Sequence, residues 1–115
     1  MKATNPVVAQ QFLVECREDY VGLWSVIRRI RAVGISERPK VIETTLDLLA
    51  QLLSEGKIVA GQFANDEFHE WKLPTQHIIE KIEREWIELG RDPTIGEIAW
   101  FTTIKSAPPT RRFAP

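Results

Sequence analysis

The sequence predicts a mainly α-helical fold with one β-hairpin, an α+β arrangement that is winged-helix-like. Apolar residues recur at spacings of three and four along three long stretches, which is typical of helices that bury one face. Two short segments rich in aromatic and β-branched residues, with a turn between them, separate the second stretch from the third. Helix, helix, hairpin, helix is the order of a winged-helix module with an N-terminal extension. We expect three long helices and a short C-terminal helix.

The chain has the size and composition of one domain. It contains 115 residues, of which 43% are hydrophobic and 27% charged, so it can bury one modest core and not two. We predict a single domain over residues 1–104 and an extended or disordered tail over residues 105–115, "KSAPPTRRFAP". No run approaches the roughly 18 to 20 apolar residues of a membrane span, and the first residues lack the apolar stretch of a signal peptide. We therefore expect a cytoplasmic protein without a membrane partner.

The first helix is predicted to begin at Asn5 and Pro6, because Asn can cap unpaired amides and Pro suits the first helical position. Gly22 can bend or split this helix, with Asp19 as a second cap, and Gly34 suits the left-handed residue that closes it. The apolar stripe of its second half consists of Tyr20, Leu23, Trp24, Ile27 and Ile30.

The second helix is predicted from Pro39 to Gly56, with an apolar face at helical spacing. Residues 57–72 are predicted to form the hairpin, because "KIVAGQF" and "FHEWK" flank the turn sequence "ANDE". The third helix is predicted from Thr75 to Gly90. Its helical phase leaves Ile87 on the side opposite the apolar face, between charged residues. The apolar faces of the second and third helices contain Ile42, Thr45, Leu46, Leu49, Leu52 and Leu53, and Ile78, Ile79, Ile82, Trp86 and Leu89, respectively.

The segment "ELGRDPTIGEIAWF", residues 88–101, joins the third helix to the C-terminal region. Asp92 and Pro93 favour a turn, and Thr94 with Glu97 three residues later has the form of a capping box. We favour a short helix after this cap, and the alternative is a strand, because "IAWFTTI" is rich in β-branched and aromatic residues and Gly96 weakens a helix. In either case we expect the apolar side chains to close one end of the core, namely Ile95, Ile98, Trp100 and Phe101.

The sequence carries no catalytic motif, phosphate-binding glycine loop or dinucleotide fingerprint. The single Cys16 lies within an apolar helical pattern and is interpreted as a packed side chain. His69 and His77 fall on different predicted elements and do not form a metal-binding motif. We therefore predict a protein that is not an enzyme, with no catalytic residues, metal site or cofactor.

Charge is distributed unevenly along the chain although the net charge is only -1. Residues 28–40 contain five bases and one acid, an excess of +4, whereas residues 66–88 contain seven acids and three bases, an excess of -4. An acidic surface favours a basic protein partner through complementary potentials, and partly exposed Trp residues can anchor such a partner. The predicted partner-binding residues are Asp66, Glu67, Glu70, Trp71, Glu80, Glu83 and Ile87.

A DNA-binding regulator is the alternative function, since a winged helix can read DNA. The bases that would contact phosphates are Arg28, Arg29, Arg31, Arg38 and Lys40. Against this alternative, the predicted recognition helix carries Glu43, Asp47 and Glu55, and the wing tip reads Asn65, Asp66, Glu67. These carboxylates would repel the phosphate backbone.

The sequence "HIIEKIEREWIELGRDPTIGEIAWF", residues 77–101, resembles the C-terminal part of a family of small bacterial proteins with the motif LGRDPxIGEIAWF. The resemblance extends more loosely to residues 19–31 and 52–63. Members resemble single-domain proteins encoded near toxins. This resemblance implies an immunity-type or antitoxin-like inhibitor of a basic protein such as a toxin, and it transfers no residue role. A second, local likeness joins "LGRDPTIGEIA" to the start of a helical module of bacterial sigma factors. It ends at Trp100, and we interpret it as a shared capping solution.

Overall fold

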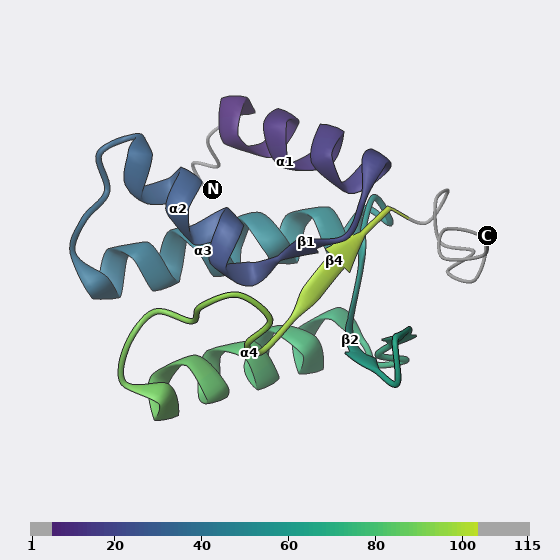
Figure 1. The fold of residues 1–115 in the computed structure, drawn as a ribbon. Helices are drawn as coiled ribbons and strands as arrows, with labels where there is room; N and C mark the ends of the chain where they lie inside the picture. The colour runs from purple at the N-terminus through teal and green to yellow at the C-terminus, as the bar shows by residue number, and fades with distance from the viewer. Residues whose placement is uncertain (1–5, 104–115) are drawn as a thin grey trace.

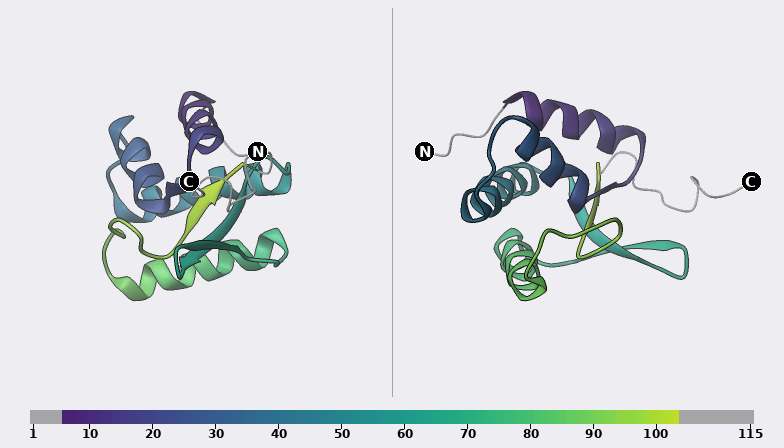
Figure 2. Two further views of the ribbon diagram at one scale, coloured as in Figure 1. Left: turned by 45° about the vertical axis from the view of Figure 1, so that its right-hand side comes forward. Right: turned by 60° about the vertical axis from the view of Figure 1, so that its left-hand side comes forward.

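The computed structural model describes residues 6–103, and within them it shows four helices and a four-stranded antiparallel sheet, which confirms the α+β class. In chain order the elements are α1 (Pro6–Glu18), β1 (Val21–Gly22), α2 (Leu23–Ala32), α3 (Arg38–Ser54), β2 (Val59–Ala64), β3 (Glu67–Glu70), α4 (Thr75–Leu89) and β4 (Trp100–Thr102). α1 and α4 lie on opposite sides of the molecule, with α2, α3 and the sheet between them (Figure 1, Figure 2). The predicted tail and the Asn5 cap lie outside the described residues.

The sheet joins distant parts of the chain. Its strand order is β1-β4-β2-β3, and all neighbouring strands are antiparallel. β4 is the last strand in the sequence, yet it lies between the first two: Trp100 pairs with Gly22 on one side and with Gly61 on the other. β4 therefore holds the N-terminal helices and the hairpin together.

The predicted short C-terminal helix is wrong, because residues 100–102 form β4 and the residues before it form turns. One hydrogen bond of the predicted capping box is present: the Glu97 carboxylate accepts the amide N–H of Thr94 at 2.7 Å. No helix follows, since Gly96 and Ile98 adopt left-handed φ angles of 84° and 71°. The backbone groups of β1 and β2 need hydrogen-bond partners, and β4 supplies them.

The predicted long N-terminal helix is split near Gly22 into two helices. α1 ends at Glu18, and α2 begins at Leu23, whose amide donates to the carbonyl oxygen of Ala99 at 3.0 Å. Tyr20 therefore lies in the connection before β1 and does not belong to a helical stripe. Pairing with β4 converts a continuous amphipathic pattern into two helices.

The hairpin and the third predicted helix are confirmed. β2 and β3 pair from Ala64 with Glu67, across a two-residue turn in which Asn65 and Asp66 have φ angles of 56° and 66°. Positive φ at both positions is the geometry of a type I′ turn, which Asn and Asp tolerate. α4 ends at the left-handed Gly90, whose φ is 76°.

The core lies between the helices and one face of the sheet. Phe101 is fully buried and meets the ring of Phe12 edge-on, with centroids 5.8 Å apart. Ile98 packs against this core, but Ile95 is 70% exposed and Trp100 only partly buried. The prediction that all four apolar residues close the core is therefore wrong for Ile95 and holds only in part for Trp100. Neighbouring residues of a strand point to opposite faces, so Trp100 and Phe101 cannot both enter the core.

Candidate functional site

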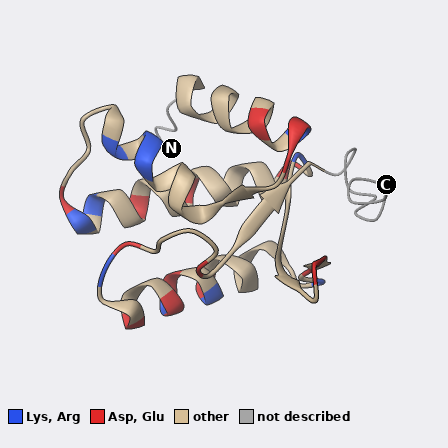
Figure 3. Cartoon of the chain, in the orientation of Figure 1, with Lys and Arg blue, Asp and Glu red and all other residues tan. Residues whose placement is uncertain are grey.

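The predicted acidic surface is divided by the fold into two places. Glu83 and Ile87 lie on the side of α4 that faces α3, whereas Asp66 lies at the hairpin turn beside the aromatic residues of the sheet. Glu67 and Glu70 are exposed on β3, and Glu80 is exposed on α4. Figure 3 shows the acidic residues of α4 and of the hairpin as separate groups. The residues predicted from one run of sequence therefore do not all line the same hollow.

Trp71 has the partial exposure that an anchor for a partner requires, but it also has contacts within the fold. Its side chain is partly buried and packs against the core. The Lys81 ammonium lies 5.0 Å from the centroid of its ring, and Lys81 also forms an ion pair with Glu85 at 2.7 Å. This cation–π contact ties the end of the hairpin to α4. Trp71 therefore already has an internal cationic partner.

A groove of about 640 Å³ lies between α3 and α4, and we call it the helix groove. Ile79, Glu83 and Ile87 are spaced four residues apart on α4, so they form a row along one helix face. α3 contributes an equivalent row through Ile42 and Leu46. Ile87 is 53% exposed, Ile79 is partly exposed, and Ile42 and Leu46 are buried, so the open apolar surface of the groove is mainly that of Ile87. The described lining residues are Arg38, Pro39, Ile42, Glu43, Leu46, Asp47, Ile79, Glu83 and Ile87.

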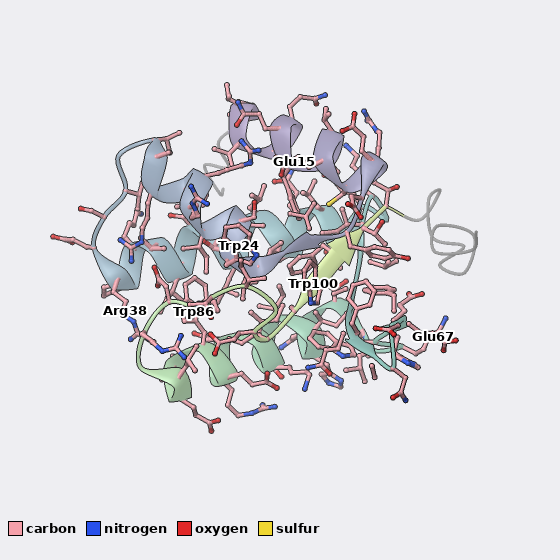
Figure 4. All side chains as sticks on the ribbon, in the orientation of Figure 1. Glu15, Trp24, Arg38, Glu67, Trp86 and Trp100 are labelled. Atoms are coloured by element: carbon pink, nitrogen blue, oxygen red, sulfur yellow. The ribbon has the colours of Figure 1, made fainter. Side chains whose placement is uncertain are left out.

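Arg38 fixes one end of the helix groove. Its Nη2 donates to the carbonyl oxygen of Trp86 at 3.2 Å, and the two residues lie side by side in Figure 4. Trp86 is in the last turn of α4, where carbonyl groups lack partners within the helix and carry partial negative charge. Arg38 therefore caps α4 from the start of α3 and holds the two helices in register.

The basic cluster is engaged largely in contacts within the fold. Arg29 forms an ion pair with Glu15, which lies on α1. Arg31 donates to Asp92 at 2.9 Å and so joins α2 to the loop after α4. Lys40 lies 3.7 Å from Glu43, three residues along α3.

Arg28 is the remaining base of this cluster. It is exposed, and its guanidinium lies 5.3 Å from the ring centroid of Trp24. Together with the Arg38 contact to α4, these pairings give each of the five bases a partner in the described part of the chain. Three of the five charges therefore lie beside a carboxylate, whereas Arg28 contacts an aromatic ring and Arg38 a backbone carbonyl.

A second hollow, of about 560 Å³, lies on the outer side of the sheet, and we call it the aromatic cleft. Its described lining residues are Asp19, Tyr20, Phe63, Asp66 and Trp100. The Phe63 ring meets Trp100 edge-on at 5.3 Å and Tyr20 edge-on at 4.9 Å. Three rings from three separate segments therefore pack around one opening that has two carboxylates at its edge.

The register of the sheet places these rings together. Gly61 pairs with Trp100, and Phe63 lies two residues further along β2, so Phe63 and Trp100 share one face. Phe68 pairs with Phe63, and their ring centroids are 5.7 Å apart. A Cβ on Gly61 would lie 2.3 Å from the His69 carbonyl oxygen and 2.8 Å from the Phe68 ring, so glycine is required for this close packing.

Trp100 also borders a smaller hollow of about 260 Å³, which shares Asp19 and Tyr20 with the aromatic cleft and extends to Trp24 and the exposed Ile95. Gly22 permits this arrangement, because a Cβ there would lie 2.7 Å from the Trp24 ring. Figure 4 shows Trp24 and Trp100 in the middle of the molecule. The two hollows therefore form one surface around the Trp100 indole.

The loop that carries Ile95 is held by an exposed ion pair. Arg91 donates to both carboxylate oxygens of Glu97, at 2.9 and 3.0 Å. These bonds, together with the Thr94 amide, lower the pKa of Glu97 from 4.5 to about 2, and Glu97 in turn raises the pKa of Arg91. The loop geometry therefore depends on an ionised Glu97.

Tyr20, Phe63 and Trp100 are not among the site residues that the sequence predicts. The sequence pattern places Tyr20 in the apolar stripe of a continuous helix and Trp100 in the core. Reading residues 98–104 as a strand would have placed Trp100 and Phe101 on opposite faces and left one ring outside the core. The strand alternative for residues 98–104 therefore predicts that one of these two rings lies outside the core.

Cys16 is buried, as the sequence predicts, and burial raises the pKa of its thiol. Among residues 6–103, no group of three or more His, Cys, Asp or Glu side chains is placed to hold a metal ion. No helix in this part of the chain is long and apolar enough to cross a membrane. No protein-family model, curated protein or solved structure matches the chain.

Proposed function

We propose that this chain is a non-enzymatic protein-binding domain that receives a basic amphipathic helix of a partner in the helix groove. The observation that carries the proposal is the exposed apolar side chain of Ile87, which is 53% exposed and lies in a groove with carboxylates in its lining. Among the described lining residues, Glu43, Asp47 and Glu83 face a single base, Arg38, which donates to the Trp86 carbonyl. The formal charge of the lining is therefore -2.

The shape of the helix groove supports a helical occupant. Two neighbouring helices form a trough into which a third helix can pack its apolar ridge. A partner helix with apolar residues at spacings of three and four would cover Ile42, Leu46 and Ile87, and flanking Lys or Arg residues would lie beside the carboxylates. Complementary charge would speed the encounter and exclude acidic partners.

The proposed fold is winged-helix-like in the order from β1 through α3 to the hairpin, with α4 and β4 added. In that comparison α3 takes the place of the DNA-reading helix. Its groove side carries Glu43 and Asp47, and the hairpin turn carries Asp66 followed by Glu67. This charge supports a protein partner over a nucleic acid, and it is compatible with an immunity-type inhibitor that covers a basic toxin.

The test is a pull-down from a lysate of the native cell, at low and moderate salt, with a groove variant and a matched control. The groove variant combines Glu83→Lys with Ile87→Ser. The control combines Glu88→Lys with Val14→Ser, which makes the same charge reversal and a similar replacement of a β-branched apolar side chain by Ser at exposed positions outside the groove lining. We expect wild type and control to retain one stoichiometric basic protein. We expect the groove variant to retain at most about one tenth of that amount.

Two results would contradict the proposal. Equal retention by the groove variant and the control would exclude the helix groove as the binding surface. Retention of DNA that is released as salt rises would instead indicate the alternative regulator. In that case neutralising Arg28 and Lys40, the most exposed bases of the cluster, would weaken retention.

A further inference from the structure

We propose that the aromatic cleft binds the guanidinium group of an arginine that is presented by a peptide. The cleft is formed by the α1–β1 connection, β2, the hairpin turn and β4, whereas the helix groove is formed by α3 and α4. The two sites share no described lining residue. Failure of the helix-groove proposal would therefore not affect the proposal for the aromatic cleft.

The aromatic walls favour a cation. The Phe63 ring stands nearly perpendicular to the rings of Tyr20 and Trp100, at interplanar angles of 79° and 89°. Tyr20 is buried against Phe63 and Phe68, so the partly exposed rings of Phe63 and Trp100 supply the accessible aromatic surface. An aromatic face attracts a positive charge, and indole does so best. The same protein holds two of its own cations in this way, Arg28 over Trp24 and Lys81 over Trp71.

The two carboxylates at the edge distinguish among cations. Asp19 is oriented by the amide of Tyr20, which donates to its Oδ1 at 2.7 Å, and Asp66 is held in the left-handed position of the hairpin turn. A guanidinium can stack on an aromatic ring while its N–H groups donate to carboxylates. A quaternary ammonium has no N–H to donate, so this combination of rings and carboxylates favours arginine.

The size of the surface favours a peptide over a free small cation. A volume of about 560 Å³ falls within the range of about 300–1,000 Å³ typical of ligand pockets, which exceeds the needs of a single guanidinium. The adjoining hollow continues past Trp100 to Trp24 and Ile95, with Glu15 and Glu18 also in its lining. Residues next to the bound arginine would lie over this second hollow.

The experiment is an NMR titration of the ¹⁵N-labelled chain with the peptide acetyl-Gly-Arg-Gly-amide. The indole N–H of Trp100 is the reporter, assigned by its loss in Trp100→Phe, and the buried indole of Trp86 is the internal control. Peptides with citrulline or trimethyllysine in place of arginine serve as comparators. We expect a saturable shift of Trp100 with the arginine peptide, and roughly tenfold weaker binding of citrulline, which keeps the shape but loses the charge.

Variants test the named side chains. Asp19→Asn together with Asp66→Asn keeps the shape of both side chains, and Asn tolerates the left-handed turn position. We expect this pair to weaken arginine binding roughly tenfold. The matched control, Glu67→Gln with Glu70→Gln, neutralises two carboxylates of β3 outside the described cleft lining and should bind like wild type.

Each contrary outcome overturns the proposal in a distinct way. No saturable shift of Trp100 would mean that the cleft takes no guanidinium. Equal binding of citrulline would show that charge is not recognised, and stronger binding of trimethyllysine would assign the cleft to alkylated ammonium groups. Equal weakening by the control pair would reduce the effect to general surface charge.

Discussion

Replacing Gly61 with alanine tests whether the sheet packs as closely as the structure shows. The new Cβ would lie 2.3 Å from the carbonyl oxygen of His69 and 2.9 Å from the Cα of Glu70. Ordinary contact begins near 3.4 Å, so backbone atoms of β2 and β3 must separate by roughly 1 Å. Overpacking costs about 1–3 kcal/mol, and a clash with backbone belongs at the upper end.

Alanine also restricts the unfolded chain, which offsets about 0.4–1 kcal/mol of that cost. We therefore expect Gly61→Ala to lower the free energy of unfolding by about 2 kcal/mol. Gly22→Ala is the comparison: its Cβ meets the Trp24 ring at 2.7 Å, and a side chain yields more easily than a backbone carbonyl, so we expect a smaller loss than at position 61.

Urea denaturation followed by circular dichroism measures both variants, and an unchanged slope with a lower midpoint identifies a change in stability. A loss at position 61 below about 0.5 kcal/mol, or no greater than the loss at position 22, would refute the proposed packing of β2 against β3.

Three further predictions concern α4, the loop after it and the buried thiol. Ile82→Ala should cost about 2–5 kcal/mol in urea denaturation and Ile87→Ala below about 0.5, since Ile82 is fully buried and Ile87 is 53% exposed; equal losses would contradict the orientation of α4. The pKa of Glu97 is lowered to about 2, so its stabilising contribution is complete above pH 4.5 and is lost as the pH falls toward 2; a carboxyl NMR titration with a midpoint near 4.5 would exclude the Arg91 pair. Cys16 should react with thiol reagents far more slowly in the native state than in denaturant, and equal rates would show that it is accessible.

Several features could be predicted because their information lies within a few residues. The apolar spacing in α3 and α4 sets their buried faces, and Gly90 ends α4 through its left-handed conformation. The hairpin follows from two short β-forming segments around Asn65 and Asp66. The exposed position of Ile87 also follows from helical phase alone.

Other features depend on contacts that no local pattern contains. Thr94 and Glu97 have the spacing of a cap in the sequence and form a hydrogen bond in the structure. The segment after them is nevertheless a strand, because the backbone groups of β1 and β2 need partners. The same pairing divides the first helix at Gly22. Arg31 is 61 residues from its partner Asp92, so its charge could be assigned to a surface cluster from the sequence but not to an internal ion pair.

The sequence by itself determined the α+β class, the hairpin and the faces of the longer helices, because periodicity, glycine caps and turn residues act over short distances. Only the tertiary structure decided the two candidate binding surfaces. Ile87 lines a groove because α4 packs beside α3. Trp100 is only partly buried because β4 pairs with Gly22 and Gly61, which places Trp100 and Phe101 on opposite faces of the sheet. Both outcomes depend on pairing between segments that are far apart in the chain. A local pattern does not show which segment will supply the hydrogen bonds that a strand needs or cover the apolar face of a helix.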